Sequence, residues 1–180
     1  MKPLMPDLPI RKGSLRKPSN CYSDDAIYFV TFKVHNNNCF LGQVIDGVVD
    51  KSAEGEITEL QWLWLAQHYP YVILHKFIVM PDHVHAIIEI DHEAGVGYDL
   101  SLECKIKPLS ELIGSFKTTS TKKIRQEINP KFEWQRSFHD HIIRNEHEYN
   151  LISEYIKNNP EKWQLRRDTH GRDRSRPVRS

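Results

Sequence analysis

Two histidines, His83 and His85, form the pattern in this sequence that most directly indicates chemistry. They open the run HVHAIIEI, residues 83–90, directly after Pro81-Asp82. Residues two apart on a β-strand point to the same face, so both imidazoles would face one side of a sheet. Neutral imidazole binds Mn²⁺, Zn²⁺, Co²⁺ and Ni²⁺ more readily than Mg²⁺. The spacing therefore indicates a divalent-metal pair, although an isolated H-x-H pair is more often one packed and one solvated histidine.

A second candidate pair, Tyr155 and Asn159, lies far downstream. The two residues are four apart on a predicted helix and share one face. The Asn159 carbonyl oxygen can ligate a metal, and the Tyr155 hydroxyl can attack a phosphate that the metal holds. Such attack leaves a covalent phosphotyrosine and a free DNA hydroxyl. Packing is the ordinary role of a helical tyrosine, and Tyr149 is a competing hydroxyl with Ser153, not an amide, four residues on.

Other polar residues are candidates for supporting roles. Asp82 and Glu89 could orient the histidines, although a turn role is preferred for Asp82. Trp134, Phe138 and His139 could stack on unpaired bases, although Trp134 fits a core position equally well. A further group consists of basic residues expected to meet DNA phosphates, with a solvated surface as the alternative: Lys117, Lys122, Lys123, Arg125, Arg136 and Arg144.

Length and composition limit the class of protein. A chain of 180 residues with 39% apolar residues suits one domain with short tails. The net charge is only +1, but residues 1–26 and 164–180 are rich in Lys and Arg, which indicates an anionic partner or solvated tails. The three cysteines show no CxxC spacing, and no apolar run approaches the ~20 residues of a membrane span or forms a signal core. We therefore expect a cytoplasmic protein without membrane contact.

The pattern of apolar residues and turn signals predicts an α+β fold. The predicted elements, in chain order, are strands over 27–34 and 43–49, a helix over 59–68, strands over 71–80 and 83–90, a helix over 110–126, a strand over 134–143 and a last helix over 146–158. Thr58 and Ser110 are the expected caps of the first two helices. Leu60, Leu63 and Trp64 are expected to face inward. This order predicts a ferredoxin-like sandwich, an antiparallel sheet with helices packed mainly on one face.

Four ordered motifs carry a resemblance to a known family. They are MPDHVHAIIEI, GSFKTTSTKK, WQRSFHDHIIRNEHEY and YIKNNPEKW, and a basic leading segment, IRKGSLRKP, precedes them. Together they resemble the REP-associated tyrosine transposases, which belong to the single-tyrosine branch of the HUH endonucleases. The resemblance covers residues 27–163, which we take as the domain.

The resemblance implies a function and assigns residues to it. By position, His83, His85 and Asn159 match the ligands of a Mg²⁺ or Mn²⁺ ion, and Tyr155 matches the nucleophile. Insertion-sequence relatives often have Gln where this chain has Asn159. The implied activity is a metal-dependent single-stranded DNA endonuclease and strand transferase that forms a 5′-phosphotyrosine, acting on single-stranded or hairpin DNA as a monomer or homodimer.

Three alternatives remain open at the level of sequence. One is a catalytically silent single-stranded nucleic-acid binding module on the same fold. Another is a metal hydrolase that uses bound water, with Tyr155 as a bystander. A relaxase or replication initiator would share the chemistry, but the short chain and the single tyrosine favour the transposase branch.

Overall fold

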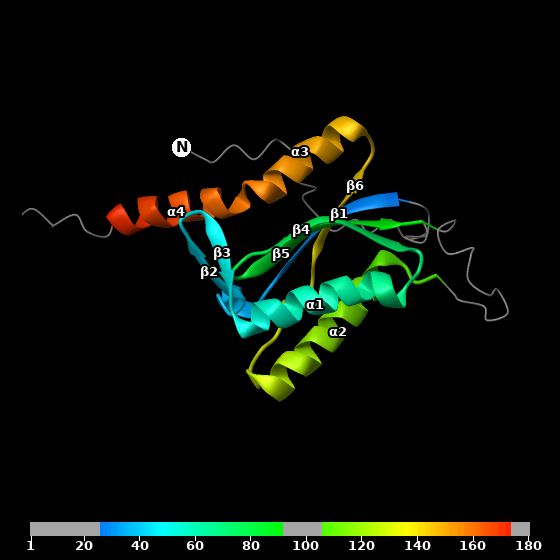
Figure 1. The fold of residues 1–180 in the computed structure, drawn as a ribbon, viewed down its shortest axis with the longest axis horizontal. Coiled ribbons are helices and arrows are strands. Elements are labelled where there is room, and N and C mark those ends of the chain that lie inside the picture. The colour runs from blue at the N-terminus through cyan, green and yellow to red at the C-terminus, as the bar shows by residue number, and fades with distance from the viewer. Residues whose placement is uncertain (1–25, 92–105, 174–180) are drawn as a thin grey trace, which may run out of the picture.

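The computed structural model describes residues 26–91 and 106–173 (Figure 1). Its elements are β1 (Ala26–Lys33), η1 (His35–Asn37), β2 (Gly42–Ile45), β3 (Val48–Lys51), α1 (Ala53–His68), β4 (Val72–Val79), β5 (His83–Ile90), α2 (Leu109–Glu127), β6 (His139–Ile143), α3 (Glu146–Lys157) and α4 (Asn159–Asp173). The predicted basic arm lies outside the described residues except for Ala26, and so do Cys21, Cys104 and the end of the predicted C-terminal tail. None of the described helices is both long and apolar enough to cross a membrane.

The main sheet has the strand order β4-β5-β1-β6, and every neighbouring pair is antiparallel. Helix α1 connects β1 to β4, and α2 connects β5 to β6, so the chain follows the β-α-β-β-α-β order of a ferredoxin-like sandwich. The predicted α+β fold class is therefore confirmed. Strand β5, which begins with His83, is one of the two central strands, so hydrogen bonds to β1 and β4 hold it on both sides.

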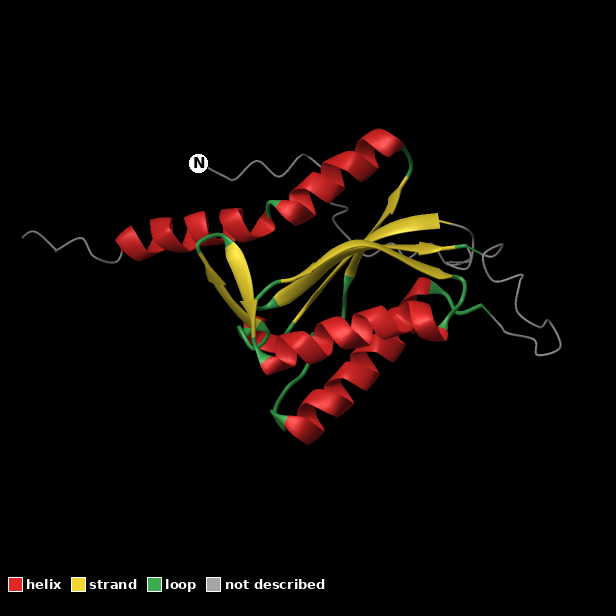
Figure 2. Ribbon diagram, viewed as in Figure 1, coloured by secondary structure: helices red, strands yellow, loops and turns green. Residues whose placement is uncertain are grey.

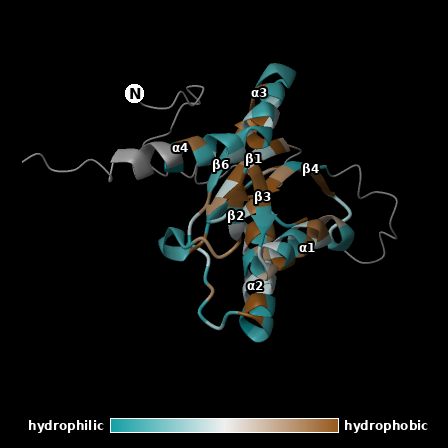
Figure 3. Cartoon of the chain, turned by 60° about the vertical axis from the view of Figure 1, so that its left-hand side comes forward, coloured by the Kyte–Doolittle hydropathy of each residue, from teal (hydrophilic) through white to brown (hydrophobic). Residues whose placement is uncertain are grey.

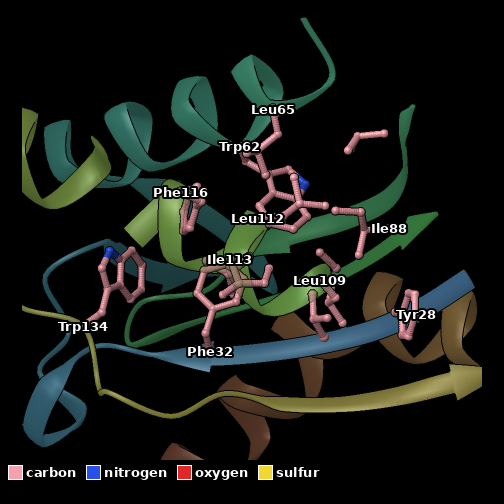
Figure 4. Packing of buried hydrophobic residues seen from close by; sticks show 14 of the residues in the cluster. Tyr28, Phe32, Trp62, Leu65, Ile88, Leu109, Leu112, Ile113, Phe116 and Trp134 are labelled. Carbon is pink, nitrogen blue, oxygen red and sulfur yellow. The ribbon is translucent and has the colours of Figure 1, made fainter. Parts of the chain in front are cut away.

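Helices α1 and α2 cover one face of the sheet, and α3 crosses the other (Figure 2). The larger core lies on the α1 and α2 side, where Phe32 of β1 packs against Trp62 of α1 and Phe116 of α2, with ring centroids 5.7 Å and 5.0 Å away (Figure 4). All three side chains are fully buried. Because buried aromatic side chains remove large apolar areas from water, this cluster is a main source of the stability of the fold.

A smaller apolar cluster lies between the sheet and α3. Its buried members are Ile87 of β5, Ile143 of β6, and Ile152 and Ile156 of α3. Side chains alternate along a strand, so Ile87 shares its face with His83 and His85, while Val84, Ala86 and Ile88 belong to the larger core. The hydropathy of the chain follows this arrangement, with brown residues along the strands and teal ones at the upper end of α3 (Figure 3). The histidine pair thus faces the α3 side.

The predicted start of α1 is wrong. The helix begins at Ala53 after Ser52, whose side chain accepts a hydrogen bond from the backbone N–H of Gly55. Thr58 lies within the helix, where its hydroxyl donates to the carbonyl of Glu54 at 2.7 Å.

The predicted inner face of α1 is also wrong at Leu60 and Leu63, which are exposed, whereas Trp64 packs, partly buried, against the larger core. The buried stripe is Thr58, Gln61, Trp62 and Leu65, which has helical spacing. Two of its members are polar, so a search for apolar periodicity selects another face.

Two further elements differ from the prediction. The strand expected over residues 43–49 is a hairpin of β2 and β3, turned at Asp46-Gly47, where both φ angles are positive, 50° and 74°. Asp-Gly is the usual sequence of such a two-residue turn. The helix expected to be the last is followed by α4, which has Pro160 in its first turn, where a missing N–H costs nothing. Helix α4 extends to Asp173, and the domain limits at 27 and 163 stay a prediction.

The segment before β6 and the start of α2 also differ in detail. The predicted strand over 134–143 is regular only over His139–Ile143, and Trp134 forms an isolated bridge to Val34. The Trp134 indole is 5% exposed and donates to the Ser120 hydroxyl at 2.9 Å, so it is a core residue. Helix α2 is preceded by Pro108, and Ser110 lies within its first turn instead of capping it.

Candidate functional site beneath the α3–α4 junction

The two histidines of β5 form a close, buried pair. His83 is 7% exposed and His85 6%, and their Nε2 atoms lie 3.0 Å apart. Two imidazole nitrogens at ~2.1 Å from one metal ion and at right angles to each other would be about 3.0 Å apart. The separation of the two nitrogens therefore fits a shared divalent ion.

The outer nitrogen of each ring has an oxygen partner. Nδ1 of His85 is 2.8 Å from the Thr31 hydroxyl, and Nδ1 of His83 is hydrogen-bonded to the Asp82 carboxylate. With Nδ1–H donated to these oxygens, each Nε2 keeps its lone pair for a ligand. Asp82 therefore orients His83, and the preference for a turn role alone was wrong. Glu89 does not contact the pair, because its carboxylate bonds His75 at 2.7 Å.

Burial, together with neighbouring positive charge, keeps His85 neutral. Burial lowers the pKa of His85 well below its ordinary value, and the neighbouring His83, Lys33 and Arg166 lower it further. A neutral imidazole is the form that binds a metal ion. The same surrounding charges favour an anionic ligand such as a DNA phosphate.

Tyr155 lies beside the pair. Its hydroxyl is 3.4 Å from Nε2 of His85, and its ring packs edge-on against Phe29, with centroids 6.2 Å apart. The hydroxyl thus lies close to one of the two Nε2 atoms that would bind a shared ion. The competing hydroxyl, that of Tyr149, is placed elsewhere, 3.2 Å from Nδ1 of His75.

Asn159 stands between two residues that touch the histidines. Tyr155, four residues earlier, contacts His85, and Trp163, four residues later, packs on the ring of His83 with centroids 5.7 Å apart. Asn159 is 7% exposed at the start of α4.

The donor types around the pair leave a place for an amide ligand. Within residues 26–91 and 106–173, no group of three or more His, Cys, Asp or Glu side chains could hold a metal. An amide oxygen is a further ligand type for a divalent ion, and Asn159, between Tyr155 and Trp163 in the chain, supplies one.

The sequence analysis did not identify several residues of the site. Thr31 and Lys33 share the site face of β1, and Lys33 pairs with His83 in the strand register. The Lys162 ammonium lies 5.4 Å from the centroid of the Tyr155 ring. Strand alternation in β1 was a usable signal for the first two. Lys162 and Trp163 were missed because the helix was expected to end before Pro160.

The basic residues expected to meet DNA are not gathered at the pair. Helix α2, which carries Lys117, Lys122, Lys123 and Arg125, covers the opposite face of the sheet. Burial lowers the pKa of Lys117 to about 8. Its ammonium donates to the carbonyls of Gln135 and Ser137 at 2.8 Å and 3.0 Å.

Arg125 also has a partner within the chain, because its Nε donates to the carbonyl of Phe132 at 2.7 Å. Lys122, Lys123, Arg136 and Arg144 are exposed. Contact between DNA and any of the six basic residues remains a prediction.

Comparison with known proteins finds a relative in sequence and a solved structure with a similar fold. No family model matches the chain. An uncharacterized protein of Haemophilus influenzae is 32% identical over 162 residues, which cover 85% of this chain and 90% of that protein. The structure of the REP-associated tyrosine transposase bound to a REP hairpin is similar, with a TM-score of 0.54 and 20% identity over 76% of this chain and 67% of that one. The suspected resemblance is thus confirmed at the level of the fold.

Proposed function

We propose a function from this premise: the chain belongs to the same protein family as the Haemophilus influenzae relative, and it has the fold of the REP-associated tyrosine transposase. The proposed activity is metal-dependent cleavage and transfer of single-stranded DNA through a covalent 5′-phosphotyrosine. The observation that carries the proposal is the 3.4 Å separation between the Tyr155 hydroxyl and Nε2 of His85. A nucleophile placed this close to a metal-binding pair is the arrangement that phosphodiester transfer requires.

Tyr155 performs the covalent step in this proposal. Its phenolic oxygen bonds to the phosphorus of the scissile phosphodiester, and the bond from phosphorus to the 3′ oxygen breaks. The phenol gives up its proton, and the departing 3′ oxygen takes one up, so the products are a 5′-phosphotyrosine and a DNA 3′-hydroxyl. A 3′-hydroxyl of the same or another strand reverses the step, so cutting and rejoining use one site and the phosphodiester energy is conserved in the adduct.

The ligands and their supports have separate roles. A Mg²⁺ or Mn²⁺ ion bound by His83, His85 and Asn159 would polarise the scissile phosphate and stabilise charge on the departing oxygen. The Asp82 carboxylate and the Thr31 hydroxyl hold the two imidazoles in place.

Positive charge and packing around the pair support the same reaction. The Lys162 ammonium beside Tyr155, together with Lys33, attracts the anionic backbone. The Trp163 ring covers His83 and limits the access of water.

The proposed partner is single-stranded DNA with hairpins, as found in repetitive elements. The transposase whose fold this chain shares was solved with a REP hairpin. Because α2 lies across the sheet from His83, we assign its exposed Lys122 and Lys123 to the hairpin stem and not to the scissile strand. The protein acts as a monomer or as a homodimer.

A labelled hairpin oligonucleotide with a single-stranded extension tests this function. Incubation with Mn²⁺ or Mg²⁺ is expected to give an adduct that survives SDS and carries the 3′ part of the DNA, while the 5′ part is released with a free 3′-hydroxyl. EDTA should prevent both products. A shift in mobility without cleavage would identify a binding module, and cleavage without an adduct would identify a hydrolase that uses water.

A further inference from the structure

We propose that the β2–β3 hairpin is a positioning device: its turn holds α4, the helix that begins at Asn159 and packs Trp163 on the ring of His83. The inference rests on the proposed function in one respect, because the position of Asn159 matters for catalysis only if the site binds a metal. The contact between hairpin and helix is independent of that function.

The tip of the hairpin is bonded directly to α4. The backbone N–H of Gly47 donates to the Oε1 atom of Gln164 at 2.9 Å, a contact between residues 117 positions apart. A Cβ atom on Gly47 would lie 3.2 Å from Cγ of Glu161, and the φ angle of Gly47 is +74°. Glycine thus lets the turn approach the helix closely, and β2 and β3 both pack against α4.

The base of the hairpin is fixed to α1. The backbone N–H of Ser52 donates to the carbonyl of Leu41 at 3.1 Å, and its hydroxyl donates to the carbonyl of Phe40 at 2.5 Å. A Cβ atom on Gly55, in the first turn of α1, would lie 2.1 Å from the Leu41 carbonyl oxygen. Since α1 carries Trp62 into the main core, the hairpin projects from a rigid base to α4.

Helix α4 needs such support. Between α3 and α4, Asn158 has a non-helical ψ of 6°, so the two helices are separate segments. Figure 1 shows α4 extending beyond the main sheet, with the hairpin turn against it. A helix of this length is marginally stable without tertiary contacts.

The helix brings site residues with it. Gln164, which the hairpin holds, directly follows Lys162 and Trp163 in the chain. The Trp163 ring packs against the His83 ring, and the Lys162 ammonium lies over the Tyr155 ring. Displacement of α4 would therefore loosen one side of the site while leaving His85 and Tyr155 in contact.

Gln164→Ala removes the acceptor for the turn, and Gln43→Ala is its matched control. Gln43 donates to Asp50 at 3.0 Å within the same hairpin, so its loss leaves the bond between Gly47 and Gln164 in place. Loss of the Gln164 contact is expected to raise the amide exchange rates of Gly47 and of residues 162–167 about fivefold. This factor corresponds to the loss of one hydrogen bond worth about 1 kcal/mol. It should also shift the imidazole NMR signals of His83, through the changed position of the Trp163 ring, and weaken Mn²⁺ binding about fivefold. Gln43→Ala should change none of these.

Rescue and failure are both measurable. Gln164→Glu keeps an acceptor oxygen and should return the exchange rates and the His83 signals to within about twofold of the unmodified protein. Unchanged exchange in Gln164→Ala would overturn the proposal, as would faster exchange with unchanged His83 signals and Mn²⁺ affinity. If the unmodified protein forms no DNA adduct, the proposed function fails, whereas exchange and His83 signals still decide whether the hairpin positions α4.

Discussion

The Tyr155 hydroxyl and Nε2 of His85 lie 3.4 Å apart, although 70 residues separate them in the chain. Hydrogen bonds on both sides fix His85 in a central strand. Tyr155 is flanked on α3 by Ile152 and Ile156, which are each 1% exposed and packed on the same sheet face. Ile152 and Ile156 anchor this part of α3 to the sheet by apolar contacts. The helix therefore positions the Tyr155 phenol, which needs no hydrogen bond to the backbone for this.

Tyr155→Phe is expected to abolish the SDS-resistant DNA adduct, lowering its rate of formation by at least about 1,000-fold, because no hydroxyl remains to attack. DNA binding, measured by fluorescence anisotropy, should change by less than about twofold, since the ring still packs on Phe29. Tyr149→Phe is the control on the same helix, and its adduct should persist. The reverse pattern would assign the nucleophile to Tyr149.

Substitution of the residues that hold the histidines should weaken metal binding. Thr31→Val removes the hydroxyl bonded to His85, and Asp82→Asn replaces the carboxylate bonded to His83 by a neutral amide. Each change is expected to lower Mn²⁺ affinity about 10–100-fold in calorimetry. His83→Ala should remove measurable binding. Glu89→Gln changes a carboxylate on the same strand that bonds His75 and should leave the affinity unchanged. Equal losses in the Glu89 and Asp82 variants would contradict a specific site.

The sequence was sufficient to predict an element where a single strand or helix periodicity of apolar residues dominates it. The strand over 83–90 is observed with those bounds, and α3 lies within one residue of its prediction. Both elements have a clear apolar pattern, so the strand that carries His85 and the helix that carries Tyr155 could be predicted, and the two side chains lie in contact. Their roles as ligand and nucleophile stay predictions. The antiparallel sheet followed from the hairpin signal at Pro81-Asp82 and the alternation of strands and helices.

Other features depend on contacts that one sequence does not display. The inner face of α1 contains Thr58 and Gln61, which are buried because the long helix lies along the core, not because they are apolar. The β2–β3 turn had a readable Asp-Gly signal that was missed. Its bond to Gln164 joins segments 117 residues apart, and no local pattern specifies such a pairing.

Two pairs of lysines should affect DNA binding differently. Lys33 lies near the histidine pair, and Lys162 lies near Tyr155. Replacing either lysine by alanine is expected to reduce the slope of log K against log salt concentration, for binding of a short single strand, by about 0.7. Lys122→Ala with Lys123→Ala, on the opposite face, should weaken only the binding of a hairpin with a long stem. Titrations at several salt concentrations check both. Equal effects of the two pairs on the short strand would contradict this division.

Two helical glycines should respond to alanine in opposite directions. Gly55→Ala places a Cβ atom 2.1 Å from the Leu41 carbonyl oxygen, and the resulting overpacking is expected to cost about 1–3 kcal/mol of unfolding free energy. Gly114→Ala, on the exposed side of α2 with no atom within 4 Å of the new Cβ, should stabilise the protein by up to about 1 kcal/mol. Urea unfolding measures both. Stabilisation by both changes would show that α1 does not press on the hairpin base.

Lys117 should give the protein a pH-dependent stability above neutrality. Burial lowers its pKa in the folded chain to about 8, against 10.5 as the ordinary value. Below pH 8 the ammonium is charged in both states, and burial penalises the folded one. Between these two pKa values the unfolded chain binds more protons, so stability rises with pH.

The comparison with Lys117→Met measures this effect. After allowance for the partial exposure of Lys117, we expect its free energy of unfolding to rise between pH 7 and 10 by on the order of 1 kcal/mol relative to that variant. The neutral amine keeps two N–H donors for the carbonyls of Gln135 and Ser137. Urea unfolding of both proteins across this range measures the difference, and a constant or falling difference would contradict the lowered pKa.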